Sequence, residues 1–511
     1  MNIGEWISKR AIIAPDKPFL AEKNRVYDNR QFAAKVNRTA RALGHLGVAK
    51  GMRIALLLSN SSEFLEIFFA CAQTGIIMVP LNFRLAVPEL LYILRDSAPE
   101  MLIYSPEFAA RIAEIKTAGV HTKYYCLTAA QVSGDPVFED YVEGLESEEP
   151  KAAAEVGLPD PLFIMYTSGT TGDPKGAVLT HQNILFGAIH SLLGYGIDRS
   201  YKSLVVAPLF HIGALAASVT PIVYAGGSLV VSSFYSASET LETICREKVN
   251  YMFAVPVMYQ LMANAPEWSE SDLSHVHFFI SGGAPIPLSV IRKYQDEKGV
   301  GFVQGYALTE TGRLTSLDLE DSIRKAGSVG KEVFHVDLRI VDDGGCDVRP
   351  AEPGEIIVRG PNIFAGYWNK EAATKAAFAG GWFRTGDMGR RDEEGFVYIV
   401  GRKVEMIISS GENIYPVEVE RALQGIPGIR EAAVVGLADS KRGEVVGAFI
   451  IREKDALITE SAVVSALDGK IACYKIPRKI FFVDEFPRNS GGKILKRILK
   501  KRAEENGTEK G

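Results

Sequence analysis

The segment Leu162–Gly176 reads LFIMYTSGTTGDPKG and restricts the fold more than any other part of the chain. An apolar run of strand length leads directly into a loop whose glycines permit unusual backbone angles. Hydroxyls, main-chain N–H groups and the ammonium of Lys175 can face one concavity there, which suits a polyphosphate. The loop lacks the Gly-Lys-Ser/Thr ending of a Walker A motif, so a standard P-loop ATPase is disfavoured. A Ser/Gly-rich turn without function would explain the composition, but neither the strand nor the lysine.

The chain on both sides of this loop alternates between strand-length and helix-length segments. Arg53–Leu58 precedes the amphipathic Glu63–Gln73, Ile76–Pro80 follows it, and the alternation returns from Leu204 to Glu297. This order predicts βαβ units with parallel strands, in doubly wound layers over about the first 320 residues. Ser203–Ser238 carries no Asp, Glu, Lys or Arg. Because prolines and glycines interrupt that segment, it favours a buried α/β element over a membrane span.

After about residue 328 the sequence changes to short β-rich runs separated by turns. We therefore expect an α/β protein with an N-terminal domain over residues 1–402, which includes a small β-barrel-like unit at about 328–400. A hinge at 403–404 would join it to a small, mobile α+β C-terminal domain over 405–511. The charge-dense tail from Lys496 to Gly511 is expected to fray.

Composition excludes several classes of protein. At 511 residues with 47% hydrophobic content, the chain is neither one small module nor mainly disordered. Its net charge of -5 disfavours nucleic acid as a partner. Five dispersed cysteines without a Cys-x-x-Cys pair indicate free thiols in a reducing compartment. With no signal peptide recognised at the N-terminus and no transmembrane segment, the expected location is cytoplasmic, and the oligomeric state, a homodimer included, stays open.

The phosphate-loop sequence closely resembles that of the adenylate-forming superfamily, which contains acyl-CoA synthetases, luciferases and peptide-synthetase adenylation domains. Further motifs of that family follow in order along the chain. They are Pro208–His211 (PLFH), Gln304–Thr311 (QGYALTET), Thr385–Asp387 (TGD), Gly401–Arg402 (GR), Ile408–Glu420, Tyr474–Pro477 (YKIP) and Gly491–Lys493 (GGK). The resemblance therefore spans nearly the whole sequence.

The resemblance implies an AMP-forming carboxylic acid:CoA ligase that uses ATP, Mg²⁺ and CoA. The carboxylate of a small-molecule acid would attack the α-phosphorus of ATP and release pyrophosphate. The CoA thiol would then displace AMP from the mixed anhydride. Activation is needed because a carboxylate oxygen is a poor leaving group.

By the same resemblance, four groups of residues form the site. ATP and AMP binding is expected at Thr167, Ser168, Gly169, Thr170, Thr171, Gly172, Lys175, Gly282, Gly283, Ala284, Pro285, Gln304, Gly305, Tyr306, Ala307, Thr309, Asp387 and Arg402. Catalytic roles are expected for Lys493, His211, Thr309 and Glu310, with Glu310 also the magnesium ligand. CoA binding is expected at Ser409, Ser410 and Gly411. The acyl pocket is expected at His211, Ile212, Gly213 and Ala307, and the resemblance implies that Gly282–Pro285 also wall it.

The residue types suit these roles, and each has a plainer interpretation. Glu310 offers hard oxygen ligands and Thr309 a hydroxyl for the α-phosphate, although a capping Thr with a first-turn Glu would look the same. Asp387 can accept both ribose hydroxyls with Arg402 nearby, or the two can form a surface salt bridge. Lys493 can bridge the carboxylate and the α-phosphate, or be one more solvated cation.

The sequence signals for adenine recognition and for a gate at the acid's carboxylate are weaker. The small residues of Ser281–Pro285 would let adenine lie against backbone with Tyr306 stacked on its other face. His211 could gate the acid's carboxylate, whereas a lone histidine in an uncharged segment is more often a core residue. Phe234, Tyr235, Phe253 and Met258 could line the pocket or belong to the core.

Three departures from the family pattern bear on the reaction and the substrate. Val404 stands where relatives carry Lys or Asp at the hinge, which puts the thioester-forming half-reaction in question. Ala307 replaces a glycine of the acyl tunnel, so we expect a short-chain, medium-chain or cyclic monocarboxylic acid. The gate region 210–215 has no Asp and 278–280 has no Arg, which disfavours amino acids and dicarboxylates. A protein that loads a separate carrier protein, or a nucleotide-binding protein without catalysis, remains as an alternative.

Overall fold

The computed structural model describes residues 2–128, 134–150, 155–167, 174–409, 412–439, 442–454, 456–468, 470–471, 473–489 and 492–508. The chain divides into two compact units, which are described separately below. The first unit contains Met1–Leu338 and Val358–Phe383, and the second contains Arg339–Ile357 and Arg384–Gly511. The predicted α/β class is confirmed. The predicted boundary at residue 402 and the hinge at 403–404 stay predictions.

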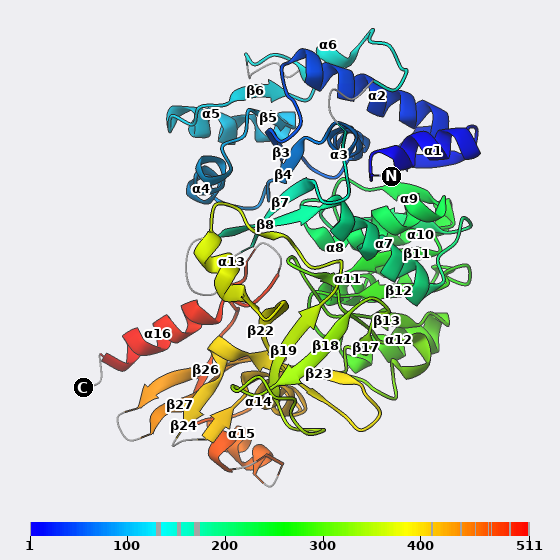
Figure 1. The fold of residues 1–511 in the computed structure, drawn as a ribbon. Coiled ribbons are helices and arrows are strands. Elements are labelled where there is room, and N and C mark those ends of the chain that lie inside the picture. Colours follow the sequence, from blue (N-terminus) through cyan, green and yellow to red (C-terminus); the bar gives the residue numbers. More distant parts are fainter. Residues whose placement is uncertain are drawn as a thin grey trace. The chain divides into compact units, whose positions relative to one another are not determined.

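One seven-stranded sheet of the first unit carries the strands expected from the Leu204–Glu297 segment (Figure 1). Its order is β13 (Phe302–Gln304), β12 (Phe278–Ser281), β11 (Tyr251–Ala254), β9 (Lys202–Val205), β10 (Ser228–Val231), β1 (Pro18–Glu22) and β2 (Arg25–Asp28). All neighbours are parallel except β1 and β2. Helices connect the parallel strands and bury both faces, which explains the continuous apolar runs.

A second seven-stranded sheet holds the strand that enters the phosphate loop. Its order is β20 (Gly366–Tyr367), β8 (Lys175–Thr180), β7 (Pro161–Thr167), β4 (Ile77–Pro80), β3 (Arg53–Leu57), β5 (Met101–Tyr104) and β6 (Lys123–Cys126). Strands β7 and β8 pair antiparallel with Thr167 opposite Lys175, so the two ends of the loop meet. Phe163 and Ile164 point to opposite faces of β7. Phe163 stacks on Phe68, while Ile164 joins a different core cluster.

The helices of the first unit cover these two sheets. They are α1 (Glu5–Ile13), α2 (Asn29–His45), α3 (Ser62–Thr74), α4 (Val87–Ser97), α5 (Ala109–Thr117), α6 (Phe138–Val142), α7 (His181–Tyr195), α8 (Ile212–Ala214), α9 (Thr220–Ala225), α10 (Ala237–Glu247), α11 (Pro256–Met262), α12 (Leu288–Lys298) and α13 (Glu371–Ala377). Helix α7 begins where the Thr180 hydroxyl accepts from the Asn183 amide at 3.3 Å. A π-helical turn, Leu215–Val219, joins α8 to α9. Ser203–Ser238 therefore forms a strand, short helices and a second strand, as predicted.

Short strands and hairpins follow in the chain. They are β14 (Ala307–Leu308), β15 (Gly312–Arg313), β16 (Thr315–Ser316), β17 (Lys331–Glu332), β18 (Asp337–Val341), β19 (Gly354–Arg359), β21 (Phe378–Ala379), β22 (Trp382–Arg391) and β23 (Val397–Arg402). β14 pairs with β15 and β16 with β17, while β18, β19, β22, β21 and β23 belong to one five-stranded sheet. This confirms the predicted change to β-rich structure after about residue 328. The boundary between the two units falls within strands of this sheet.

The C-terminal part of the second unit is an α+β arrangement. A five-stranded sheet contains β24 (Ile407–Ser409), β25 (Glu412–Ile414), β26 (Ile429–Asp439), β27 (Gly443–Arg452) and β28 (Lys479–Phe482). Its helices are α14 (Pro416–Gln424), α15 (Glu460–Leu467) and α16 (Lys496–Thr508). The prediction that the tail frays from Lys496 is wrong for residues 496–508. Leu499 and Ala503 lie four residues apart on one helical face and are buried in the core cluster that contains Phe449.

Two buried histidines of the first unit make its stability depend on pH. Burial lowers the pKa of His181 and of His190 to about 4, from the ordinary value of 6.5. The unfolded chain therefore binds more protons between pH 6.5 and 4, so the free energy of unfolding decreases as the pH falls through this window. We expect a loss of about 2 kcal/mol for each ring between pH 7.5 and 5.

The measurement is urea unfolding at pH 7.5 and pH 5. His181→Asn should reduce the pH dependence, because an amide oxygen can still accept from the Ile3 N–H, which the His181 Nδ1 accepts at 3.2 Å, but does not titrate. His121 is exposed, so His121→Gln serves as the matched control and should change nothing. An unchanged pH dependence in His181→Asn would contradict the assignment.

Candidate active site

Lys175 and Glu310 are the first two expected site residues that the fold brings together, and both contact Tyr367. The Tyr367 hydroxyl donates to Glu310 Oε1 at 3.0 Å, and the Lys175 Nζ lies 5.1 Å from the centre of the Tyr367 ring. Tyr367 reaches this position because β20 pairs with β8, with Tyr367 opposite Ala177. A cation from the end of the phosphate loop and a carboxylate from the QGYALTET motif therefore share one aromatic side chain.

The QGYALTET motif lies on a strand and a hairpin. Gln304 ends β13 and is buried, while the main-chain N–H of Tyr306 donates to the Thr315 hydroxyl at 3.1 Å. Ala307 pairs with Arg313 across β14 and β15 and is exposed. Thr309 and Glu310 lie in the turn between these strands and are half-buried. The turn interpretation replaces that of a capped helix, so Thr309 and Glu310 remain available for ligand binding.

His211 lies among aromatic side chains and one cation. Its ring centre is 4.5 Å from that of Phe210, and the Phe210 ring meets the Phe83 ring edge-on at 5.0 Å. Burial of the ring by the surrounding protein and, second, the charge of Arg84 together lower the pKa of His211 to about 4, although the residue keeps an exposed surface. His211 is therefore a neutral imidazole at pH 7, able to donate from one nitrogen and accept at the other.

Phe253 stands between two of the expected pocket walls. A Cβ atom built on Gly213 would lie 3.2 Å from Cε1 and Cζ of Phe253, and one built on Gly282 would lie 3.0 Å from its Cε2. Both positions are therefore adjacent to the same ring. Tyr235 and Met258, in contrast, join the core cluster behind β11, where the Tyr235 hydroxyl donates to the Met258 carbonyl.

Asp387 and Arg402 are joined in the second unit. They face each other across β22 and β23, and Arg402 Nε contacts Asp387 Oδ1 at 2.5 Å. Gly386 has a φ of +70°, a left-handed conformation that favours glycine at this position of β22. The salt bridge of the plainer interpretation is present, but its carboxylate is buried, since the Asp387 side chain is 6% exposed and that of Arg402 is 30% exposed.

Lys493 lies near the same pair within the second unit. Its N–H donates to the Asn489 side chain at 2.9 Å, which holds the turn that precedes α16. Desolvation of the ammonium by the surrounding protein is the main cause that lowers the pKa of Lys493, and the charge of Arg402 is the second. The charges of Glu405 and Asp387 raise this pKa, but by less. The side chain keeps exposed surface, so the group is accessible to a ligand.

Several predicted residues do not enter this description. Ser168, Gly169, Thr170, Thr171, Gly172, Ser410 and Gly411 lie outside the described residues. Ser409 is described and buried at the end of β24. Gly283, Ala284 and Pro285 are exposed in the turn after β12, which keeps their backbone open to a flat ligand. Thr167, Ile212 and Gly305 are half-buried.

Arg84 and Tyr367 were not found from the sequence. Arg84 precedes α4 and belongs to no motif used above, yet its charge acts on His211, 127 positions further along the chain. Tyr367 lies 57 positions from Glu310. No periodicity or local motif signals either contact, because both join segments that belong to different sheets and meet only in the tertiary fold.

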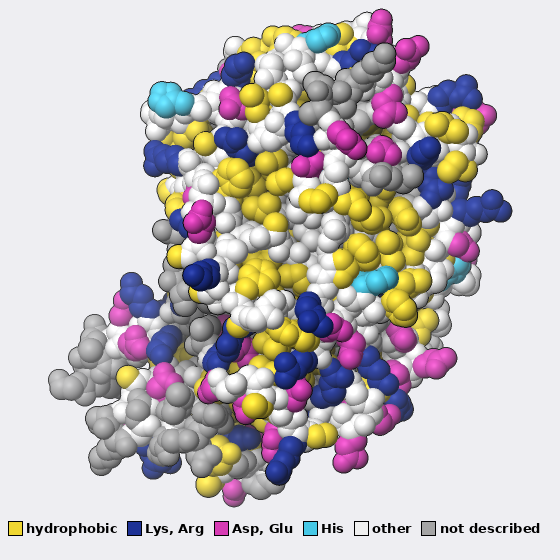
Figure 2. Space-filling model, in the orientation of Figure 1, with side chains coloured by type: hydrophobic (Ala, Val, Ile, Leu, Met, Phe, Trp, Pro, Cys, Tyr) yellow, Lys and Arg dark blue, Asp and Glu magenta, His cyan; other side chains and the backbone are white. Residues whose placement is uncertain are grey.

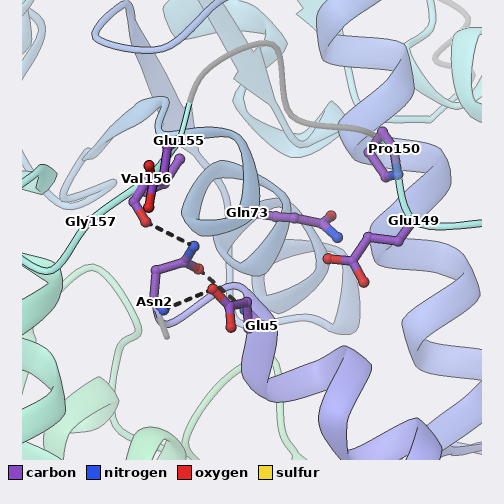
Figure 3. Close-up of a pocket in the computed structure, with 8 residues that line it drawn as sticks. All are labelled: Asn2, Glu5, Gln73, Glu149, Pro150, Glu155, Val156 and Gly157. Carbon is purple, nitrogen blue, oxygen red and sulfur yellow. Dashed lines mark hydrogen bonds between the residues drawn. The ribbon is translucent and has the colours of Figure 1, made fainter.

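A separate cavity of about 350 Å³ in the first unit has the wrong chemistry for a nucleotide (Figure 3). Glu5, Glu149 and Glu155 contribute to its lining, and Asn2 donates to the Val156 carbonyl at 3.3 Å. None of its eight lining residues is Lys or Arg. Phosphate binding needs cations or convergent N–H donors, so the glycine-rich loop remains the better phosphate site.

The described residues fit a magnesium ion held jointly with ATP rather than by the protein alone. Within the described ranges, no group of three or more His, Cys, Asp or Glu side chains could hold a metal ion. Mg²⁺ is usually bound by one or two carboxylates together with substrate phosphates, which Glu310 can satisfy. Across the same ranges, the structure contains no helix of the length and apolarity needed to cross a membrane.

Comparison with known families decides between the remaining interpretations. A model described as AMP-binding enzyme matches residues 8–368, and a model described as AMP-binding enzyme C-terminal domain matches residues 418–493. The chain belongs to the AMP-binding enzyme family. The predicted membership of the adenylate-forming superfamily is therefore confirmed, as is the class of acid–thiol ligase that uses ATP with Mg²⁺ and CoA.

Relatives of this ligase differ in the acid that their names contain. A feruloyl-CoA synthase of Amycolatopsis sp is 37% identical over 502 residues, which are 98% of this chain and 99% of the relative. The long-chain-fatty-acid–CoA ligase FadD13 of Mycobacterium tuberculosis is 38% identical over 509 residues, 98% of each chain. The crystal structure of ATP-bound MatB from Rhodopseudomonas palustris superposes with a TM-score of 0.89 at 30% identity, over 98% of this chain and 99% of that one. An AMP-forming acyl- or aryl-CoA ligase activity follows for this chain.

Proposed function

We propose that this AMP-forming ligase activates a compact monocarboxylic acid, either cyclic or of short to medium chain length, and transfers it to CoA. The observation that carries the proposal is the position of the Phe253 ring against Gly213 and Gly282. A ring that contacts both walls occupies volume through which a long straight chain would have to pass. The methyl group of Ala307, which replaces a glycine of the family's acyl tunnel, is expected to reduce the size of the pocket further.

The surroundings of His211 favour a flat or compact acid. Phe83, Phe210 and His211 present ring faces and edges to one another, an arrangement that packs well against an aromatic or alicyclic ring. Phe234 is 58% exposed beside Phe83, with ring centres 6.3 Å apart. Figure 2 shows hydrophobic side chains gathered on the surface over α8 and α11, and the exposed Val257 and Leu261 of α11 belong to this part of the chain.

The chain's own residues would act as follows. Lys175 and the phosphate loop hold the polyphosphate, and Glu310 holds Mg²⁺, which neutralises phosphate charge when bound. His211 and Arg84 orient the carboxylate towards the α-phosphorus by hydrogen bonding and by charge. Asp387 and Arg402 bind the ribose. Lys493 stabilises the charge that develops between carboxylate and α-phosphate, and Ser409 begins the loop that later meets CoA.

The test is mass-resolved product formation with Mg-ATP and a panel of acids, each with and without CoA. The panel runs from acetate to palmitate and adds benzoate and cyclohexanecarboxylate. We expect acyl-CoA and AMP from one cluster of cyclic or short to medium acids, and little product from palmitate. Acyl-adenylate without thioester would instead favour transfer to a separate carrier protein. Palmitate as the best substrate would overturn the proposed substrate class.

Ala307→Gly tests the size of the pocket directly. Removing one methyl group should shift the preference towards longer or bulkier acids by about 10-fold in relative kcat/KM, since one methylene in an apolar pocket contributes about 1 to 3 kcal/mol. The measurement is kcat/KM across the same panel. Ala326→Gly lies in a turn outside the predicted site and is the matched control. An unchanged chain-length profile in Ala307→Gly would remove Ala307 from the pocket.

A further inference from the structure

His190 on α7, Arg313 on β15 and His335 after β17 form a basic cluster, with His335 half-buried, that the reaction described above does not use. Arg313 is 7% exposed and His190 is 1% exposed. The rings of His190 and His335 stack with centres 5.2 Å apart and planes 25° apart. We call these three residues the α7–β15 cluster.

Arg313 is held without a carboxylate. Its guanidinium carbon lies 3.7 Å from the centre of the Tyr195 ring, its Nε donates to the Thr315 carbonyl at 3.2 Å, and its Nη1 donates to the His190 carbonyl at 3.3 Å. Nη2 has no hydrogen-bond partner among the described residues. Among the same described residues, no carboxylate forms an ion pair with Arg313. The cluster therefore contains a buried cation whose Nη2 group is an unused hydrogen-bond donor.

The hydrogen bonding of the His190 ring is also incomplete. Neither ring nitrogen meets hydrogen-bonding geometry with a described residue, and neither does Nδ1 of His335. The main chain of Arg313 comes near enough to raise the pKa of His190 slightly, but burial and the charges of His335 and Arg313 dominate and lower it to about 4. His190 is consequently neutral at pH 7 and offers one donor and one acceptor.

One strand pairing of Arg313, and two contacts made by residues next to the cluster, link it to the expected acid pocket. Arg313 pairs with Ala307, and directly opposed residues of an antiparallel pair project to the same side of the hairpin. Ser191, next to His190, donates to the Ala216 carbonyl at 3.4 Å in the π-helical turn that follows His211. Tyr251, whose ring centre lies 6.4 Å from that of Tyr195, donates its hydroxyl to the Ala217 carbonyl in the same turn. π-helical turns occur frequently at functional sites.

Buried donors of this kind require an acceptor. An unpaired polar group away from water costs about 1 to 3 kcal/mol, and a charged one more, so such groups are nearly always satisfied by protein, water or ligand. Because the guanidinium can only donate, the complementary group must carry an acceptor oxygen or a negative charge. The aromatic side chains of Phe186 and Tyr195 on either side favour a compact group over an extended polar one.

We infer that the α7–β15 cluster binds an acceptor oxygen at the far end of the acid, with Arg313 as the residue that determines specificity. This inference rests on the proposed function and narrows it. The acid class is then a compact monocarboxylic acid that carries a hydroxyl or carbonyl group remote from the carboxylate that is activated. A plain hydrocarbon acid would leave the guanidinium without its acceptor.

The test compares matched acids on the intact enzyme. The pairs are 4-hydroxybenzoate with benzoate, 4-hydroxyphenylacetate with phenylacetate, and 4-oxopentanoate with pentanoate, each measured as kcat/KM for acyl-CoA formation. We expect the oxygenated member of at least one pair to be preferred by about 10- to 100-fold, the range expected for a hydrogen bond to a charged donor. Arg313→Met should abolish that preference and raise the relative use of the hydrocarbon acid.

Two further variants separate recognition from folding. His190→Phe keeps an aromatic ring against His335 but removes both nitrogens, and should reduce the preference without abolishing it. Arg324 is exposed and pairs with Asp321, so Arg324→Met is the control that should leave the ratio unchanged. Because the ratio within one variant cancels a general loss of activity, a purely structural role of Arg313 would not alter it.

The outcomes distinguish the two proposals. Wild-type enzyme that forms acyl-CoA without preferring any oxygenated member, or Arg313→Met that retains the preference, would overturn the role of the cluster and leave the ligase proposal intact. The wild-type comparison decides the matter even if Arg313→Met does not fold. No acyl-CoA from any compact acid would overturn the proposed function itself.

Discussion

Lys493→Ala should form acyl-adenylate about 100- to 1000-fold more slowly than the wild-type enzyme, which is the usual effect of removing a preorganised donor from a site of developing charge. The same variant should still convert a preformed acyl-adenylate to acyl-CoA, because that step needs the CoA thiol and not the lysine. The measurements are pyrophosphate release for the first half-reaction and thioester formation from synthetic acyl-adenylate for the second.

The environment of Lys493 adds a dependence on pH. Its pKa is lowered, first by burial and then by Arg402, so the ammonium loses its proton at a lower pH than the ordinary value of 10.5. Because catalysis needs the charged form, the adenylation rate should fall on the alkaline side before an ordinary lysine would titrate. In Lys493→Ala this alkaline decrease should disappear from the residual rate.

Lys496 provides the matched control for this prediction. It lies three residues further on and contacts Glu420 at 2.8 Å and Glu405 at 3.5 Å. Lys496→Ala removes a positive charge from the same segment but should leave adenylation within a few-fold of the wild-type rate. Adenylation at the wild-type rate in Lys493→Ala, or an equal loss in both variants, would refute a specific role for Lys493.

Glu310→Gln should reduce adenylation by about 100-fold and raise the Mg²⁺ concentration needed for half-maximal rate. The amide keeps the size of the side chain and can still accept from the Tyr367 hydroxyl, but it loses the charge that a hard divalent cation prefers. The measurement is the initial rate of pyrophosphate release over a series of Mg²⁺ concentrations at saturating ATP.

Tyr367→Phe distinguishes the contribution of the Glu310 charge from that of the hydrogen bond that orients the carboxylate. This variant keeps the aromatic ring beside Lys175 and the charge of Glu310, and removes only the hydroxyl. We expect a loss of about 10-fold or less, because a single neutral donor contributes about 1 kcal/mol. A Glu310→Gln enzyme with an unchanged Mg²⁺ requirement would exclude Glu310 as the magnesium ligand.

Much of the fold follows from short-range patterns. The run Leu162–Tyr166 predicts a buried strand, and the structure places β7 there with Leu162, Phe163 and Ile164 fully buried. The alternation from Leu204 to Glu297 predicts strands and helices, and β12 and α12 lie in that stretch. These predictions succeed because strand and helix formation depends mainly on residues within a few positions of one another.

The tail shows where short-range reasoning is insufficient. Lys496–Thr508 is rich in charge, which predicts a solvated end, yet Leu499 and Ala503 are buried. Two apolar residues four positions apart are enough when a sheet face that contains Val435 and Phe449 is available to cover them. That face belongs to strands about 50 to 70 positions earlier, so composition alone does not reveal it.

The sequence by itself determined the family and the identity of the motifs, because each motif is a short continuous run of residues. Only the tertiary structure decided that Arg84 acts on His211, that Phe253 stands against Gly213 and Gly282, and that Arg313 and His190 meet. Such contacts join residues that are more than 100 positions apart or that lie on different helices and strands. They depend on which strands become neighbours and how helices cover them, which is a property of long-range packing and not of any local pattern.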